Sequence, residues 1–160
     1  GHAQHVLHLF ALGQLQQEIY KLFVGDEANR AINISVMSFG FKYGIPMDCD
    51  LVFDVRFIPN PYYIPNLKPK TGLDAEVADY VMSFSESKTF LNKLVDMVDF
   101  LLPLYVKEGK SHLVIGIGCT GGKHRSVTIA TELFGKLKEL EISAVAEHRD
   151  IERDDKGASS

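Results

Sequence analysis

The stretch HLVIGIGCTGGKHRS, residues 112–126, decides the fold because it joins a strand, a glycine-rich loop and the start of a helix. Its apolar run Leu113-Val114-Ile115 predicts a strand over 112–118 that is buried on both faces, as in a parallel sheet. A helix is expected from about Arg125. Its inward-facing residues, at helical spacing, are Ala130, Leu133, Phe134 and Leu137.

Further strands and helices are predicted on both sides of this unit. The expected strands are 32–38, 50–55 and 142–146, and the expected helices are 9–23, 74–82 and 83–105, the last opened by a Ser83/Glu86 capping box. Four prolines between residues 56 and 71 exclude a regular helix or a central strand there. Alternating strands and helices predict a three-layer α/β sandwich around a mostly parallel sheet of about four strands, with an N-terminal amphipathic helix.

The chain length of 160 residues fits one domain. We expect residues 1–30 to form an N-terminal helix or linker, residues 31–153 the ligand-sensing domain, and residues 154–160 a flexible tail.

Composition excludes several classes of protein. The two cysteines have no CxxC or zinc-ligand spacing, so we expect neither a disulfide framework nor a metal site. No apolar run approaches the roughly 20 residues that cross a bilayer, and we expect a cytoplasmic protein without a membrane partner. A net charge of −4 argues against a surface that grips nucleic acid broadly.

Three motifs overlap in the glycine-rich loop. Residues 116–121 satisfy G-x-G-x-x-G, but too few strands follow for a dinucleotide fold. The nucleotide-hydrolysis pattern G-x-x-x-x-G-K-[ST] fails because Ile117 and His124 stand at two required positions. The pattern Cys-x5-Arg-Ser, from Cys119 to Ser126, matches the cradle of cysteine phosphatases.

All three motifs share the chemistry of an anion site: glycines that allow close approach, backbone N–H groups and a helix N-terminus. Lys123, His124 and Arg125 are three potential cations in a turn where the helix dipole disfavours positive charge, unless an anion binds. The alternative is a tight turn with solvated basic residues. The predicted contacts in the loop are Thr120, Gly121, Gly122, Lys123, His124, Arg125 and Ser126.

Five residues outside the loop are further candidates. Asp54 and Arg56 could hold sugar hydroxyls or form a structural ion pair. Lys42 is a phosphate contact or a solvated charge, and Asn60 and Tyr62 line a pocket or pack. Because ligands of parallel sheets bind outside the carboxyl ends of the strands, we expect Asp54 beside Cys119.

Four blocks together resemble the C-terminal domain of the RapZ/YvcJ family. They are VMSFGFKYG (36–44), FDVRF with Pro59-Asn60-Pro61 (53–61), TGLD (71–74) and GCTGGKHRS (118–126). Members of this family also carry an N-terminal P-loop domain that hydrolyses nucleotides. We therefore expect the chain to be a fragment that lacks that domain, and expect no cofactor here, ATP or GTP belonging to the P-loop domain.

The resemblance implies a domain that binds glucosamine-6-phosphate and, in enterobacterial members, small regulatory RNAs that are presented to an RNase. Phosphate and sugar contacts would fall on Thr120, Gly121, His124 and Arg125, with Lys42, Asp54 and Arg56 as additions. Tyr62 replaces the histidine of enterobacterial members. Homo-oligomers are also expected.

The resulting hypothesis is a regulatory sensor domain for an amino-sugar phosphate, and not an enzyme. The alternative is a cysteine-dependent phosphatase in which Cys119 is the nucleophile and Arg125 the clamp. For RNA, Arg149 and Arg153 are opposed by acidic neighbours, Asp150, Glu152, Asp154 and Asp155, so weak binding is expected near physiological salt.

Overall fold

The computed structural model of the chain describes residues 28, 29 and 31–153. Four strands form one sheet: β1 (Asn33–Gly40), β2 (Leu51–Asp54), β3 (His112–Cys119) and β4 (Ala144–His148). Their order is β2-β3-β1-β4 and every pair is parallel, which confirms the predicted α/β class. The predicted helix over 9–23 and the tail 154–160 lie outside the described residues.

Strand β3 is central, as its apolar run predicts. Residues 113–119 are all buried, between β1 on one side and β2 on the other. The register pairs Gly40 with Cys119 and Asp54 with Gly118, so three strands end side by side at the carboxyl edge of the sheet. The glycine-rich loop leaves from this edge.

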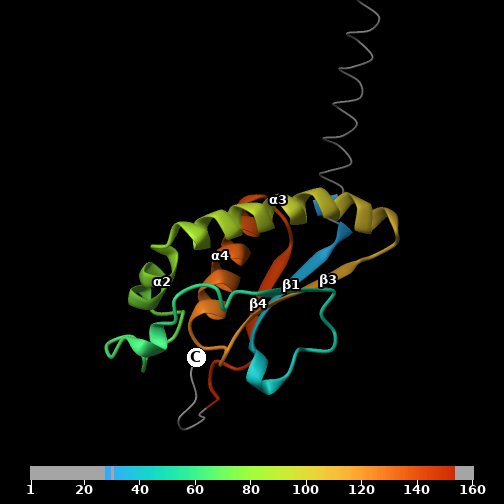
Figure 1. Cartoon of the computed structure of the whole chain (residues 1–160). Coiled ribbons are helices and arrows are strands. Elements are labelled where there is room, and N and C mark those ends of the chain that lie inside the picture. Colours follow the sequence, from blue (N-terminus) through green and yellow to red (C-terminus); the bar gives the residue numbers. More distant parts are fainter. Residues whose placement is uncertain (1–27, 30, 154–160) are drawn as a thin grey trace, which may run out of the picture.

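Three helices, α2 (Ala75–Met82), α3 (Ser85–Lys107) and α4 (Arg125–Glu139), share one apolar core with the sheet. The connections β2 to β3 and β3 to β4 cross the sheet in the same direction, so right-handed crossovers put their helices on one face. In Figure 1 the 41–50 segment lies across β1 and β3 from α3. Helices, sheet and this segment are the three layers. None of the described helices is long and apolar enough to span a bilayer.

Two glycines of β3 make room for the layer opposite the helices. A Cβ on Gly118 would lie 2.5 Å from the Phe41 ring and 2.6 Å from the Phe39 ring, and one on Gly116 would lie 2.8 Å from the Cys49 sulfur. The two phenylalanine rings meet edge to face, with centroids 4.9 Å apart. The G-x-G of β3 therefore serves aromatic packing against the sheet.

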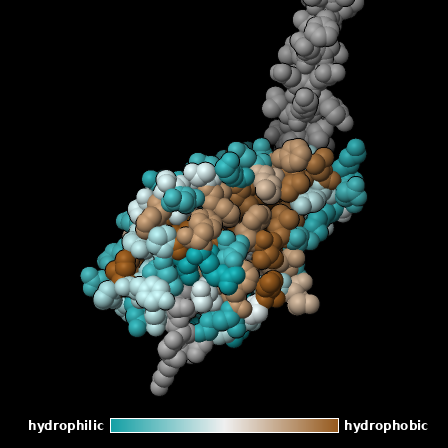
Figure 2. Space-filling model, in the orientation of Figure 1, coloured by the Kyte–Doolittle hydropathy of each residue, from teal (hydrophilic) through white to brown (hydrophobic). Residues whose placement is uncertain are grey.

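Apolar side chains also reach the surface along α3, and Figure 2 shows them gathered on this face of the molecule. Met97, Phe100 and Leu104 are 45%, 67% and 47% exposed and recur at helical spacing. We call these three residues the α3 stripe.

The predicted capping box is wrong. Helix α3 begins at Ser85 with Phe84 as its N-cap, and the Ser83 hydroxyl instead donates to the Tyr80 carbonyl at 2.6 Å. Ser83 is thus used to end α2. The fourth strand also begins two residues later than predicted, because Ile142 is buried in the turn after α4.

Gly135 offers a direct test of helix α4. It lies within the helix, and a Cβ there would meet nothing within 4 Å. Gly135→Ala is therefore expected to raise the free energy of unfolding by about 0.5–1 kcal/mol, the helix-propensity difference. Urea denaturation followed by circular dichroism measures it, and a lower midpoint would contradict the helical geometry.

Candidate functional site

The loop 120–124 is held between two glycines from distant parts of the chain. A Cβ on Gly40 would lie 2.5 Å from the Gly121 carbonyl carbon, and one on Gly72 would lie 2.5 Å from the His124 carbonyl oxygen. The Gly72 N–H also donates to the Lys123 carbonyl at 2.8 Å. The segments VMSFGFKYG and TGLD thus flank the loop, so three blocks that are distant in sequence meet at one place in the fold.

Gly122 gives the loop its tight turn. Its φ of +77° lies in the left-handed region that L side chains rarely adopt. A Cβ would also lie 2.6 Å from the Gly40 nitrogen and 2.8 Å from the Phe39 carbonyl carbon. Both conformation and space therefore require glycine at this position.

Arg125, the first residue of helix α4, is a buried cation next to the loop. It is 4% exposed, and its Nη1 donates to the carbonyls of Arg56 at 3.0 Å and Ile58 at 2.9 Å. Its Nη2 faces the Thr120 hydroxyl at 3.3 Å, and its Nε–H has no hydrogen-bond partner among the described residues. Nε and Nη2 form the fork that matches two oxygens of a phosphate or carboxylate.

Within the described part of the chain, no direct ion pair neutralises the charge of Arg125. No carboxylate of the described residues lies within ion-pair distance of it. Burial lowers the pKa of Arg125, and the nearby Cys119 and Asp54 side chains oppose that shift. An arginine stays protonated throughout the physiological range, so the site holds a buried positive charge.

Cys119 lies beneath the loop and is fully buried. Its thiol donates to the Ser126 hydroxyl at 3.1 Å. The Cys-x5-Arg-Ser pattern thus brings its members together in space, as a phosphatase cradle would. Both the sulfur and the neighbouring Arg125 Nε are buried, so a ligand could touch either atom only after the loop has moved.

His124 contributes shape to the site instead of charge. It is fully buried with Nε2 3.1 Å from the Leu67 carbonyl, which anchors the proline-rich segment beside the loop. Burial lowers its pKa, so the imidazole is neutral at physiological pH. Of the three potential cations around the start of helix α4, His124 is therefore the one for which burial disfavours the charged form.

Asp54 and Arg56 form an ion pair at the solvent-exposed edge of the site, which we call the rim. Arg56 donates through Nε and Nη2 to both carboxylate oxygens, with a shortest distance of 2.6 Å, and both side chains are about half exposed. The hydrogen bond from Arg56 lowers the pKa of Asp54. The Arg56 guanidinium also lies 4.1 Å from the centroid of the Phe41 ring. The ion pair is the structural alternative that the sequence left open.

The other predicted residues outside the loop are Lys42, Asn60 and Tyr62. Lys42 contacts the loop, whereas Asn60 and Tyr62 contact residues within 60–68. The Lys42 N–H donates to the Thr120 carbonyl at 3.2 Å, while its Nζ lies 5.2 Å from the Tyr43 ring centroid. The Asn60 side chain accepts from the Tyr62 N–H at 3.1 Å, and Lys68 Nζ lies 4.5 Å from the Tyr62 ring centroid. That Asn60 and Tyr62 contact a ligand stays a prediction.

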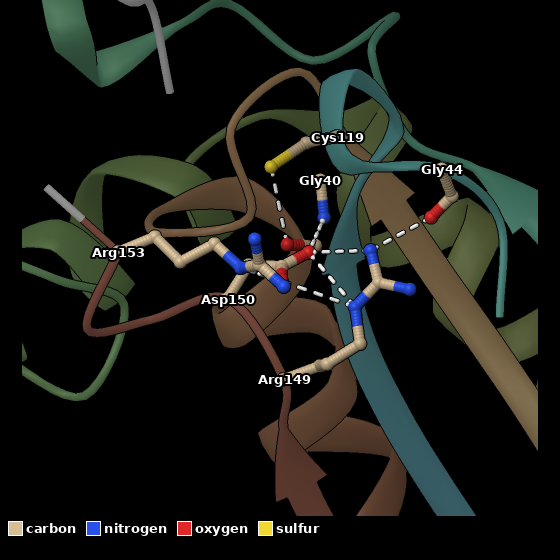
Figure 3. Close-up of polar contacts among 7 residues, drawn as sticks. Gly40, Gly44, Cys119, Arg149, Asp150 and Arg153 are labelled. Carbon is tan, nitrogen blue, oxygen red and sulfur yellow. Dashed lines mark hydrogen bonds and ion pairs between the residues drawn. The ribbon is translucent and has the colours of Figure 1, made fainter. Parts of the chain in front are cut away.

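A carboxylate beside the loop, Asp150, is one that the sequence offers only as an acidic neighbour of Arg149 and Arg153. Its side chain has no solvent exposure and accepts the Gly40 N–H at 2.8 Å. Arg149 and Arg153 both donate to it at 2.8 Å (Figure 3). Nothing in the alternating charges of 148–156 marks Asp150 as buried, so local sequence carries no signal for this role.

Comparison with known proteins places this fold and loop in context. The model of the RapZ C-terminal domain family matches residues 32–152. A protein named "Nucleotide-binding protein" from Ruminiclostridium cellulolyticum is 60% identical over 144 residues, covering 90% of this chain and 50% of that protein. Proteins of the same name from Acetivibrio thermocellus and Bacillus thuringiensis are 58% and 59% identical, over 88% of this chain and 48% and 47% of their own lengths. The chain therefore spans about half the length of these curated relatives.

Proposed function

The chain belongs to the RapZ C-terminal domain family, and from that premise and the geometry of the loop we propose that it is a regulatory sensor domain for an amino-sugar phosphate. Glucosamine-6-phosphate is the ligand that the family resemblance implies. In this proposal the phosphate lies at the 120–126 loop and the domain itself catalyses no reaction.

The buried charge of Arg125 carries the proposal. A guanidinium removed from water costs several kcal/mol unless an opposite charge compensates it. Among the described residues its hydrogen-bonding partners are two carbonyls, the Thr120 hydroxyl and the Cys119 side chain, none of them a carboxylate, and its Nε–H is unpaired. A phosphate on the Nε and Nη2 edge would supply the missing charge and two acceptors. The first N–H groups of α4, unpaired within the helix, would supply further donors.

The rim residues support a polar ligand that extends beyond the phosphate. Asp54 presents carboxylate oxygens, which accept hydrogen bonds from hydroxyl and ammonium groups. Its half-exposed pair with Arg56 is of the kind that contributes about 1 kcal/mol or less, so a ligand can exchange these contacts at small cost. The Phe41 ring contacts the Arg56 guanidinium at a centroid distance of 4.1 Å, and this cation–π contact leaves the Asp54 oxygens able to exchange partners.

Calorimetric titration of the chain tests the proposal. Glucosamine-6-phosphate is expected to bind with one ligand per chain, whereas glucosamine, which lacks the phosphate, gives no heat of binding at the same concentrations. Glucose-6-phosphate separates the phosphate contribution from that of the amine. Absence of binding by both sugar phosphates would overturn the proposed function.

Cys119 provides the test of the phosphatase alternative. Cys119→Ser keeps a hydroxyl beside Ser126, so sugar-phosphate affinity is expected to stay within about fivefold, the value of one neutral hydrogen bond of about 1 kcal/mol. The wild type is expected to release no phosphate from p-nitrophenyl phosphate. Turnover that disappears in Cys119→Ser would establish the enzyme instead.

Further partners follow from the same family resemblance and are proposals. Small regulatory RNA and an RNase are expected partners, with weak RNA binding by this chain, because Arg149 and Arg153 already share the Asp150 carboxylate. The exposed α3 stripe supports the expectation of a homo-oligomer, since apolar side chains at helical spacing are a common contact surface. A cytoplasmic location fits such partners.

A further inference from the structure

We call residues 120–126 the anion loop. The Gly40 backbone lies between this loop and the Asp150 carboxylate. Its carboxylate accepts the Gly40 N–H, and the other side of Gly40 packs on Gly121 so closely that a Cβ would lie 2.5 Å from a backbone carbon. A Cβ on Gly122 would lie 3.0 Å from the Asp150 Cβ. The carboxylate, Gly40 and the loop backbone thus form a continuous stack.

The same carboxylate also fixes the segment that borders the loop. Arg149 donates to both Asp150 oxygens through Nε, at 3.0 and 3.2 Å, and its Nη2 donates to the Gly44 carbonyl at 2.7 Å (Figure 3). Gly44 follows the 3-10 helix η1 (Phe41–Tyr43), whose Lys42 N–H donates to Thr120. Asp150 is therefore connected to the loop by two routes. One runs through Gly40, and the other runs through Arg149 and the 41–44 segment.

We propose that Asp150 is the positioning residue of the anion loop: it touches no ligand, but sets the separation between Gly40, Gly121 and Gly122 on which anion binding depends. This rests on the proposed function for its ligand and on the hydrogen bonds above for its geometry. It gives residues 149–153, which the sequence marks only as a run of opposed charges, a role in supporting the loop.

Two simple explanations of Asp150 predict opposite effects on affinity. Burial alone would raise its pKa, but hydrogen bonds from Arg149 and Gly40 and the charges of both arginines lower it, so the carboxylate is ionised at neutral pH. If it acted on the ligand only through its charge, removing that charge would strengthen binding of an anion. Because it positions the loop, removing it weakens binding.

The experiment compares Asp150→Asn with Asp50→Asn. Asp50 is a matched control: it accepts the Val114 N–H at 2.8 Å and pairs with Lys110 at 2.7 Å, but at the opposite end of the strands. Glucosamine-6-phosphate affinity is expected to fall about tenfold or more in Asp150→Asn, because small displacements of binding groups are costly, and to be unchanged in Asp50→Asn. Equal or tighter binding by Asp150→Asn would overturn the proposal.

Amide hydrogen exchange without ligand separates this proposal from the proposed function. Exchange at Gly40, Gly121 and Gly122, relative to core amides of α3 such as Leu94, is expected to speed up about tenfold in Asp150→Asn and not in Asp50→Asn. Unchanged relative exchange overturns the positioning role, even if no sugar phosphate binds. Failure of the wild type to bind sugar phosphate, with the exchange difference present, overturns only the proposed function.

Arg149→Lys keeps the proposal testable if Asp150→Asn does not fold. Lysine retains one charge for Asp150 but cannot donate to the carboxylate and to the Gly44 carbonyl in the same bidentate geometry. Relative exchange at the loop amides is expected to rise by a smaller factor than in Asp150→Asn. Wild-type exchange in Arg149→Lys would contradict the link between the 149–153 segment and the loop.

Discussion

Gly122→Ala is expected to lower the free energy of unfolding by about 2–5 kcal/mol and to abolish sugar-phosphate binding. A left-handed conformation costs an L residue about 1–2 kcal/mol. The new Cβ would overlap backbone atoms of Gly40 and Phe39, at 2.6 and 2.8 Å, and overpacking of this kind costs about 1–3 kcal/mol more. Relief requires moving β1 away from the loop, which displaces the anion site.

Gly44→Ala is the matched control for Gly122→Ala. Gly44 also has a positive φ, +88°, but a Cβ there would meet nothing within 4 Å. Its ψ of 150° places it in a region that is nearly restricted to glycine, so the substitution is expected to cost only this conformational part, about 1–3 kcal/mol. Urea denaturation of both variants measures the difference, and equal losses of stability would show that contact between Gly122 and Gly40 is unimportant.

Arg125→Ala is expected to weaken glucosamine-6-phosphate binding by about 1.5–3 kcal/mol, or about 10- to 150-fold, the range for hydrogen bonds to a charged group. Arg125→Lys keeps the charge but loses the planar fork, so its loss is expected to be smaller but still measurable. Calorimetric titration gives both values. Stability is measured alongside, because Arg125 also holds the carbonyls of Arg56 and Ile58.

Lys136→Ala is the control for the Arg125 variants. Lys136 lies near the other end of α4, where its Nζ is 3.9 Å from a Glu139 carboxylate oxygen at the surface. Removing it changes the net charge as Arg125→Ala does, but should leave affinity unchanged. Equal affinities of wild type and Arg125→Ala would contradict the assignment of the phosphate to this loop.

The centre of this fold can be predicted from the sequence because short local patterns of residues determine it. Leu113, Val114 and Ile115 form a run that only a strand covered on both faces can bury, and β3 is that strand. The helix start at Arg125 follows from the glycine-rich loop, and the observed helix begins at that residue. The carboxyl edge then brings Asp54 next to β3, as parallel strands require.

The parts that could not be predicted depend on contacts between distant residues. The sequence offers His124 as a potential cation, but its burial beside Leu67 favours the neutral imidazole. Asp150 has acidic and basic neighbours that suggest a solvated surface, and only the tertiary contact with Gly40, 110 positions away in sequence, makes it part of the site. The Ser83 capping box failed because the same hydroxyl satisfies the end of α2.

A crystal structure of the chain with glucosamine-6-phosphate tests the central claim most directly. We expect the phosphate to lie at the 120–126 loop, with oxygens within hydrogen-bond distance of Arg125 Nε and of backbone N–H groups at the start of α4. The sugar is expected to extend toward Asp54 and Arg56. A phosphate bound elsewhere on the chain, with Arg125 Nε still unpaired, would contradict the account.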